Sequence, residues 1–154
     1  MISLSEIITR ETVTLGPEDP VSRAGELMKE HRIRHIPIVK KSQELVGLIS
    51  QRDILAVASA DSECKVAADL MRTSVHTVSE DADMRGAALT MQKFKIGSLP
   101  VVNNGKLVGI VTDSDYVSLA INLLEQIELM ESEESGDYGY LEDIDELSDL
   151  AIDE

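Results

Sequence analysis

Apolar and polar residues alternate along the chain in two similar blocks of about sixty residues each. In the first block, side chains of largely apolar character recur at intervals of three and four, which places them on one face of a helix. They are Val21, Ala24, Leu27, Met28 and His31. Two short apolar runs follow, at 36–39 and 45–49, and their length is typical of strands. The first block therefore predicts a helix followed by a β-hairpin.

The second block has the same pattern. Its helical stripe consists of Met84, Ala87, Ala88 and Met91, and its two apolar runs are 99–102 and 107–111. A β-prone run precedes each helix, at 12–15 and 75–78, and a further helix is expected after each hairpin, from about Ser50 and about Thr112. Each block is thus predicted to fold in the order β-α-β-β-α.

The two blocks are copies of one unit. A shift of 63 places aligns identical residues, and a one-residue difference in the loop 40–44 then changes the shift to 62. The identical pairs are Thr14/Thr77, Ala24/Ala87, Met28/Met91, Ile33/Ile96, Pro37/Pro100, Val39/Val102, Leu45/Leu107, Val46/Val108, Gly47/Gly109, Asp53/Asp115 and Ala58/Ala120. Identities in this order indicate an internal duplication. The predicted parts are residues 1–62, residues 63–124 and a C-terminal extension, 125–154.

Each repeat also carries a strand with a proline near its start, and then Gly-hydrophobic-hydrophobic-Ser/Thr-x-x-Asp. The first copy reads HIPIV at 35–39 and GLISQRD at 47–53, and the second reads SLPVV at 98–102 and GIVTDSD at 109–115. In these motifs the chain resembles a stand-alone pair of CBS domains, named after cystathionine β-synthase, over about residues 3–124. The resemblance implies an α/β fold in which the two repeats form a pseudo-symmetric pair, here with an acidic C-terminal helical extension. It also implies a disc-shaped homodimer, and a short helix at 7–10 and at 70–73.

The Ser/Thr-x-x-Asp motifs stand where the second helix of each repeat is expected to begin. In the simplest interpretation Ser50 with Asp53, and Thr112 with Asp115, only satisfy free N–H groups as capping boxes. A ligand-binding interpretation is also open. A helix N-terminus suits phosphate, a hydroxyl can bond to phosphate or ribose, and a carboxylate can accept from two vicinal ribose hydroxyls.

The resemblance implies a set of nucleotide contacts in each repeat. One set is Thr14, His35, Ile36, Pro37, Ser50 and Asp53, and the other is Thr77, Ser98, Leu99, Pro100, Thr112 and Asp115. Elements of the two repeats can be shared between sites. Arg52 would attract phosphate to the first site, whereas Asp113 would repel it from the second. The first site is therefore the better candidate for a charged nucleotide.

The sequence contains no arrangement that is typical of an active site. It has neither a GxxxxGK loop nor an HExxH motif, and Cys64 lies far in sequence from any His-Asp pair. His31 and His35 are four residues apart, but Pro37 disfavours an unbroken helix through His35. His76 has no nearby carboxylate, so structural or adenine-stacking roles are favoured over zinc binding. We expect no enzymatic activity, no catalytic cofactor and no metal site.

Net charge is confined to the C-terminal part of the chain. Residues 1–106 hold 14 acidic and 14 basic side chains, whereas residues 107–154 hold 15 acidic side chains and no Lys or Arg. Such an acidic segment repels polyanions, so nucleic-acid binding is not expected. There is no apolar run near 18 residues and no leader after Met1, so a cytoplasmic protein without a membrane segment is expected.

The acidic extension has an apolar pattern of its own. Val117, Ala120, Ile121, Leu124 and Ile127 extend the last helix of the second repeat to about Met130. Leu141, Ile144, Leu147 and Leu150 then recur every three residues among acidic and polar positions, which indicates a short acidic amphipathic helix. The extension is either a solvated, partly disordered tail or a segment that docks on a partner or on another subunit.

The function predicted from these features is regulatory and non-enzymatic. An adenosine-containing ligand (AMP, ADP, ATP or S-adenosylmethionine) is expected to bind in the cleft between the repeats and to alter the activity of an unidentified protein target. The ligand would act as a regulator, not as a catalytic cofactor. The alternative is a scaffold protein whose clefts are empty and which acts through its acidic tail.

Overall fold

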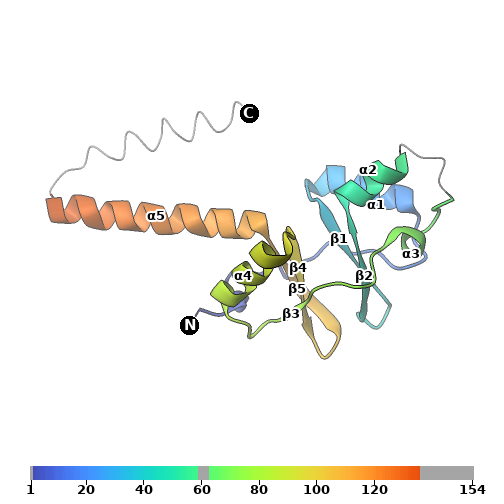
Figure 1. Ribbon diagram of the computed structural model, residues 1–154, viewed down its shortest axis with the longest axis horizontal. Helices are drawn as coiled ribbons and strands as arrows, with labels where there is room; N and C mark the ends of the chain where they lie inside the picture. Colours follow the sequence, from blue (N-terminus) through green and yellow to red (C-terminus); the bar gives the residue numbers. More distant parts are fainter. Residues whose placement is uncertain (1, 59–62, 136–154) are drawn as a thin grey trace. The chain divides into compact units, whose positions relative to one another are not determined.

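The structure is a computed structural model that describes residues 2–58 and 63–135. The chain divides into two compact units, Met1–Asp113 and Ser114–Glu154. The elements are η1 (Leu4–Glu6), α1 (Val21–His31), β1 (His35–Val39), β2 (Leu45–Ser50), α2 (Gln51–Ala58), α3 (Ala67–Leu70), β3 (Val78–Ser79), α4 (Met84–Phe94), β4 (Ser98–Asn103), β5 (Lys106–Thr112) and α5 (Asp113–Ser135). Figure 1 shows this order, in which a helix and a hairpin occur twice.

The helices α1 and α4 confirm the predicted apolar stripes. Both end at a residue in the left-handed conformation, Arg32 and Lys95, with φ of 53° in each. Their starts differ, because the Asp83 side chain accepts a hydrogen bond from the Gly86 N–H, whereas Pro20 provides no side-chain cap. Since α1 ends at His31 and His35 already belongs to β1, the prediction that no helix continues through His35 is confirmed.

The two predicted hairpins are present with the same register. Pro37 lies opposite Leu48 in the β1–β2 pair, and Pro100 lies opposite Ile110 in the β4–β5 pair. A bulge follows Ile38 in one hairpin and Val101 in the other. The second helix of each repeat starts directly after the hairpin, as the sequence predicted.

The predicted first strands are much shorter than expected. Of the run 12–15, only Leu15 forms a bridge, parallel to Ile38, and the run 75–78 contributes only Val78 to β3. Thr14 and Thr77 therefore lie outside the strands. In the first repeat, pairing stops because Gly16 enters a turn closed by Asp19, and the next residue, a proline, has no N–H to extend a ladder.

Two segments cross between the repeats. The N-terminal segment lies on the second repeat, since Leu4 N–H donates to the Ala82 carbonyl and Thr9 exchanges two hydrogen bonds with Ile110. In the same way, Arg72 exchanges two hydrogen bonds with Leu48 of the first repeat. The predicted helices at 7–10 and 70–73 are displaced by about three residues, because η1 ends at Glu6 and α3 ends at Leu70.

Two glycines make the crossings possible. A Cβ on Gly109 would lie 2.8 Å from the Thr9 carbonyl oxygen, and a Cβ on Gly47 would lie 2.5 Å from the Met71 sulfur. Neither approach is possible for a residue with a side chain unless the neighbouring atoms move. The Gly-hydrophobic-hydrophobic motif of each repeat thus begins at a position where only a hydrogen fits.

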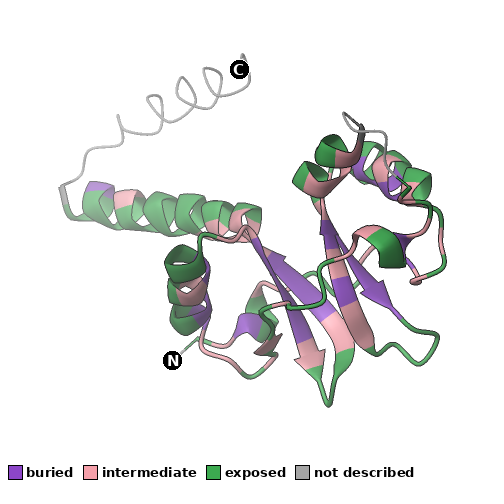
Figure 2. Ribbon diagram, turned by 45° about the vertical axis from the view of Figure 1, so that its right-hand side comes forward, coloured by how far each residue is buried: buried purple, intermediate pink, exposed green. Residues whose placement is uncertain are grey.

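The core of the first unit follows the strands of both hairpins, as Figure 2 shows. Ile36 and Leu99, which are equivalent in the two repeats, are both fully buried. In the first repeat α1 packs against β1 and α2, and α3 packs against β2, while in the second repeat α4 packs against β4. The prediction of an α/β fold with two equivalent repeats is confirmed.

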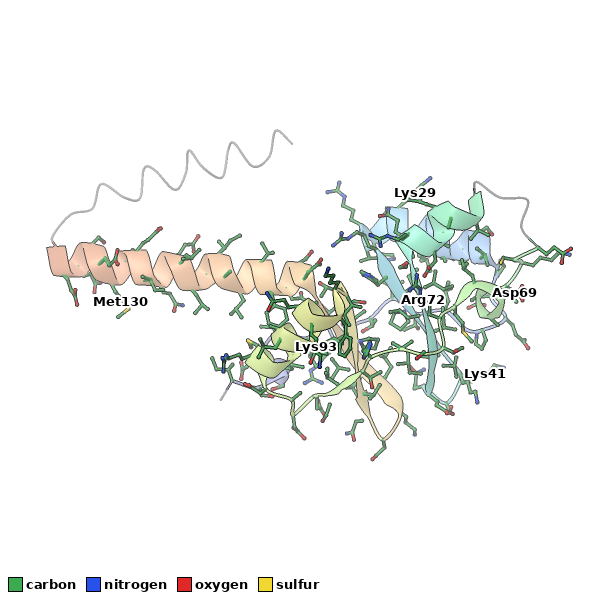
Figure 3. All side chains as sticks on the ribbon, in the orientation of Figure 1. Lys29, Lys41, Asp69, Arg72, Lys93 and Met130 are labelled. Carbon is green, nitrogen blue, oxygen red and sulfur yellow. The ribbon has the colours of Figure 1, made fainter. Side chains whose placement is uncertain are left out.

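The helix α5 continues the chain beyond the second repeat, as its apolar spacing predicted. It carries exposed apolar side chains along its length, including Val117, Leu124 and Met130, which are 57–64% exposed. The last of these is labelled in Figure 3. The predicted amphipathic helix at 141–150 lies outside the described residues.

Candidate functional site

A cavity of about 530 Å³ is lined by residues of both repeats. The first repeat contributes the start of β1, the end of β2 and the first turn of α2. The second repeat contributes the segment before β3, the turn between α4 and β4, and Asp113, the first residue of α5. The lining residues are Arg34, His35, Leu48, Ser50, Gln51, Arg52, Asp53, Arg72, Ser74, Val75, His76, Lys95, Ile96, Gly97, Ser98 and Asp113.

The junction of β2 and α2 forms a capping box in this cavity. The Ser50 N–H donates to Asp53 Oδ2 at 2.9 Å, and the Asp53 N–H donates to Ser50 Oγ at 3.2 Å. The other oxygen of the carboxylate, Oδ1, accepts from Nε and Nη2 of Arg72 at 3.2 and 3.0 Å. Asp53 is therefore held from two directions, by its own helix and by the crossing segment.

These contacts determine the ionisation of Asp53. Burial by itself would raise the pKa of Asp53, but hydrogen bonds from the Ser50 backbone and side chain and from Arg72 lower this pKa below its usual value. The carboxylate is consequently an anion at neutral pH. An anionic carboxylate can accept hydrogen bonds from ligand hydroxyls.

The second carboxylate of the cavity is also paired. Nη2 of Arg34 lies 3.0 Å from Oδ1 and 3.1 Å from Oδ2 of Asp113. Arg52 and Asp113 were expected at different sites, but both line this one cavity. Because Arg34 offsets the charge of Asp113, the expected repulsion of phosphate by this carboxylate is reduced.

The imidazole of His35 lies next to a glycine from the other repeat. A Cβ on Gly97 would lie 3.3 Å from His35 Cε1 and 3.3 Å from Asp113 Oδ2, so this position leaves little room for a side chain. Burial lowers the pKa of His35, and the nearby Arg34 lowers it further, while Asp113 and Asp53 act in the opposite direction. His35 is therefore neutral at pH 7.

An aromatic pair lies at another part of the cavity. His76, which lines it, stacks on Phe94 with ring centroids 4.1 Å apart and an interplanar angle of 22°. The ammonium group of Lys93 lies 5.4 Å from the centroid of the Phe94 ring. The stacked ring of Phe94 restricts the orientation of the His76 imidazole, in line with a structural role for His76.

The structure brings only some of the predicted contact residues together. His35, Ser50 and Asp53 line the cavity, and Ser98 of the other predicted set lines it with them. The side chains of Ile36, Pro37, Leu99 and Pro100 are fully buried in the core. Thr14, Thr77, Thr112 and Asp115 are not among the residues that line this cavity. As ligand contacts, all of these residues remain predictions.

Several lining residues were missed in the sequence, most importantly Arg34, Arg72 and Lys95. Arg72 reaches the first repeat only because its segment crosses over, and no local pattern indicates such a crossing. Arg34 could have been found from the sequence. The shift of 63 aligns it with Gly97, so the two repeats differ in charge at the position directly before the proline-containing strand motif.

The described residues form neither a metal site nor a membrane-spanning helix. Within 2–58 and 63–135, no group of three His, Cys, Asp or Glu residues could hold a metal ion. No helix in the same ranges is long and apolar enough to span a bilayer.

Comparison with known proteins identifies relatives of similar fold. The CBS domain family matches residues 4–60 and 66–122. A putative acetoin utilization protein (AcuB) from Vibrio cholerae has a similar structure, with 43% identity and a TM-score of 0.76, covering 83% of this chain and 96% of that one. CBSX2, solved in complex with AMP, has 28% identity and a TM-score of 0.75, covering 80% and 98%.

A third solved structure is the CBS domain pair of protein MJ0100 in complex with 5′-methylthioadenosine and S-adenosyl-L-methionine. It has 30% identity and a TM-score of 0.72, covering 79% of this chain and 98% of that one. Among curated proteins, the uncharacterised protein MJ1404 of Methanocaldococcus jannaschii is 37% identical over 120 residues, and the chain spans 28% of its length. Since the family matches coincide with the two structural repeats and cover most of the sequence, the chain belongs to the CBS domain family.

Proposed function

We propose that this chain is a regulatory module that binds an adenosine phosphate in the cavity shared by its repeats. The observation that carries the proposal is the charge of the lining. Four cationic side chains, Arg34, Arg52, Arg72 and Lys95, face two carboxylates, and the volume of about 530 Å³ is typical of a small-molecule site. The ligands of CBSX2 and MJ0100, which are AMP and two adenosyl compounds, support an adenosine-containing ligand.

The lining offers groups for each part of such a ligand. Leu48, Val75 and Ile96 form an apolar portion suited to an adenine ring. Asp53 can accept hydrogen bonds from ribose hydroxyls, as an acidic residue does in dinucleotide-binding folds. The arginines can donate paired hydrogen bonds to phosphate oxygens.

The excess of positive charge favours AMP, ADP or ATP over S-adenosylmethionine. The sulfonium group of S-adenosylmethionine is a cation and gains nothing from a cationic lining. We propose further that occupancy shifts the balance between arrangements of the two repeats and so alters a protein target, because the cavity is built from both.

The proposed role is non-catalytic. Both carboxylates of the cavity are engaged in ion pairs with arginines, and Asp53 is also fixed by its capping box. Such groups are arranged to hold a ligand and not to move protons during a reaction.

The proposal is tested by titration calorimetry and thermal shift with AMP, ADP, ATP and S-adenosylmethionine. A ligand at about one hundred times its dissociation constant should stabilise the protein by about 2.7 kcal/mol. Asp53→Asn should abolish most of this shift. Asp115→Asn is the matched control, since it changes the equivalent residue of the other repeat, which does not line the cavity.

If no adenosine compound binds at millimolar concentration, the proposal is wrong. If Asp115→Asn abolishes binding and Asp53→Asn does not, the ligand occupies the other predicted site, formed around Thr77, Thr112 and Asp115.

A second candidate function is that of an interaction protein, and the surface of α5 favours it. Within Asp113–Ser135 the charged side chains are all acidic, and the exposed apolar residues include Ile121, Leu124 and Ile127. We propose that this helix takes part in an interface, as the predicted homodimer requires. Sedimentation of Leu124→Glu beside the unchanged protein tests this, because dissociation is expected only if α5 contributes to the interface.

A further inference from the structure

The pairing of Arg72 with Asp53 occupies the group that the proposed function assigns to ribose. Arg72 Nε and Nη2 both donate to Oδ1, while Oδ2 accepts from the Ser50 N–H. As a result the Asp53 side chain is only 11% exposed, whereas the Arg72 side chain is 68% exposed. A ligand that approaches Asp53 finds Oδ1 already covered by the exposed guanidinium of Arg72.

The backbone of Arg72 is held independently of its side chain. Its N–H and carbonyl exchange hydrogen bonds of 2.9 and 3.0 Å with Leu48 on β2. Figure 3 labels Arg72 among the side chains around this strand. The long side chain can therefore leave Asp53 while the main chain stays in place, and both residues line the same cavity.

We infer that Arg72 is a specificity-determining residue that exchanges Asp53 for the phosphate of the ligand. This inference rests on the proposed function. In the arrangement described above, the guanidinium pairs with the carboxylate. When a nucleotide binds, the ribose hydroxyls replace the guanidinium on Asp53, and the guanidinium pairs with the phosphate.

The exchange discriminates between adenosine compounds. A phosphorylated ligand breaks the charge-assisted interaction of Arg72 with Asp53 and forms another between Arg72 and its phosphate, so the exchange costs it little binding free energy. Neutral adenosine also has to displace Arg72 but offers the guanidinium no anion in return. Arg72 thus disfavours unphosphorylated ligands in addition to attracting phosphorylated ones, which is the use of an unfavourable element for specificity.

The test is the ratio of AMP affinity to adenosine affinity, measured by calorimetry for the full chain and for Arg72→Met. Methionine keeps the apolar stem and removes all donors. We expect adenosine to bind about 2- to 5-fold more tightly to the variant. This factor corresponds to the free energy of a partly exposed ion pair, which adenosine no longer has to break. AMP should bind more weakly, so that the ratio falls by about 10- to 100-fold, which corresponds to a lost hydrogen bond to a charged group.

Arg34→Met is the matched control. Arg34 lines the same cavity and is paired with Asp113 at the same distance of 3.0 Å, but it does not contact Asp53. Its removal should weaken AMP binding through the lost positive charge and leave adenosine affinity within about twofold, because the Arg72–Asp53 pair is intact. Only Arg72→Met should strengthen adenosine binding.

The outcomes separate the two proposals. If the unchanged protein binds none of AMP, ADP, ATP and adenosine, the proposed function fails and this inference fails with it. If AMP binds but Arg72→Met leaves adenosine affinity unchanged or lower, the exchange is wrong and the proposed function stands. Should Arg72→Met not fold, Arg72→Lys replaces it, and the same tightening of adenosine to a smaller extent is the supporting result, its absence the opposing one.

Discussion

The two repeats share a backbone and differ at the cavity. Both have an eleven-residue helix that ends at a left-handed residue, a hairpin of the same register, and a glycine under a crossing segment. At the cavity the equivalent residues diverge. Arg34 and His35 correspond to Gly97 and Ser98, and Arg72 corresponds to Thr9.

The difference shows which residues carry the fold and which set the charge of the cavity. The backbone fold that the repeats share depends on glycines, on turn residues and on apolar side chains that are buried at equivalent positions in each repeat. The charge of the cavity depends on a few polar residues that differ between the repeats although the backbone fold is the same. One architecture can therefore hold two unlike halves of a single site.

The largest expected effects come from the shared core. Ile36→Ala and Leu99→Ala each remove a fully buried side chain, and each should lower the free energy of unfolding by about 2–5 kcal/mol. Since the crossing segments join the repeats, urea denaturation followed by circular dichroism should show one transition in both variants. Two transitions, one shifted and one not, would mean that the repeats unfold separately.

The crossing glycines should respond unequally. Gly109→Ala places a methyl group against the Thr9 backbone, which cannot move away without breaking its hydrogen bonds to Ile110. This variant should lower the free energy of unfolding by close to 3 kcal/mol. Gly47→Ala meets the side chain of Met71, whose Sδ and Cγ can rotate away although its Cβ would remain 2.9 Å from the added methyl group, and this variant should cost less, about 1 kcal/mol. Thermal denaturation of the two variants checks the order, and equal costs would contradict it.

A smaller effect on stability is expected at the start of α4, which has a side-chain cap that α1 lacks. Asp83→Ala removes the hydrogen bond to the Gly86 N–H and should lower the free energy of unfolding by about 1 kcal/mol. Asp81→Ala is the control, since it removes a carboxylate of equal charge two residues earlier, outside the cap. Comparison of the urea midpoints separates loss of the cap from loss of charge.

The smallest effect concerns pH. Burial lowers the pKa of His35 in the folded protein, so below about pH 6.5 the unfolded chain binds more protons than the folded one. This contribution to stability is therefore complete above pH 6.5 and is lost as the pH falls toward the folded pKa. His35→Ser, which introduces the residue of the second repeat, should make urea stability less dependent on pH between 7.5 and 5.5. An unchanged pH dependence would contradict the assignment.

Local patterns predicted the helices and hairpins because the information lies within a few residues. The stripe from Val21 to His31 and the motif from Gly47 to Asp53 are examples, and the capping box at Ser50 was predicted to the residue. The cavity was predicted only in part. Its position depends on Arg72 and Gly97, which are brought to the first repeat by pairings between distant parts of the chain.

The crossing of the N-terminal segment has a consequence for biosynthesis. Thr9 pairs with Ile110, so the segment around Thr9 leaves the ribosome about a hundred residues before its partner strand is made. At typical elongation rates of about 5–20 residues per second, that interval lasts roughly 5–20 s. During this time Ile8 has no β5 to lie against, and for part of it Leu48 of the first repeat still lacks its partner Arg72. A nascent chain that ends before β5 is therefore expected to be less stable than the complete pair of repeats.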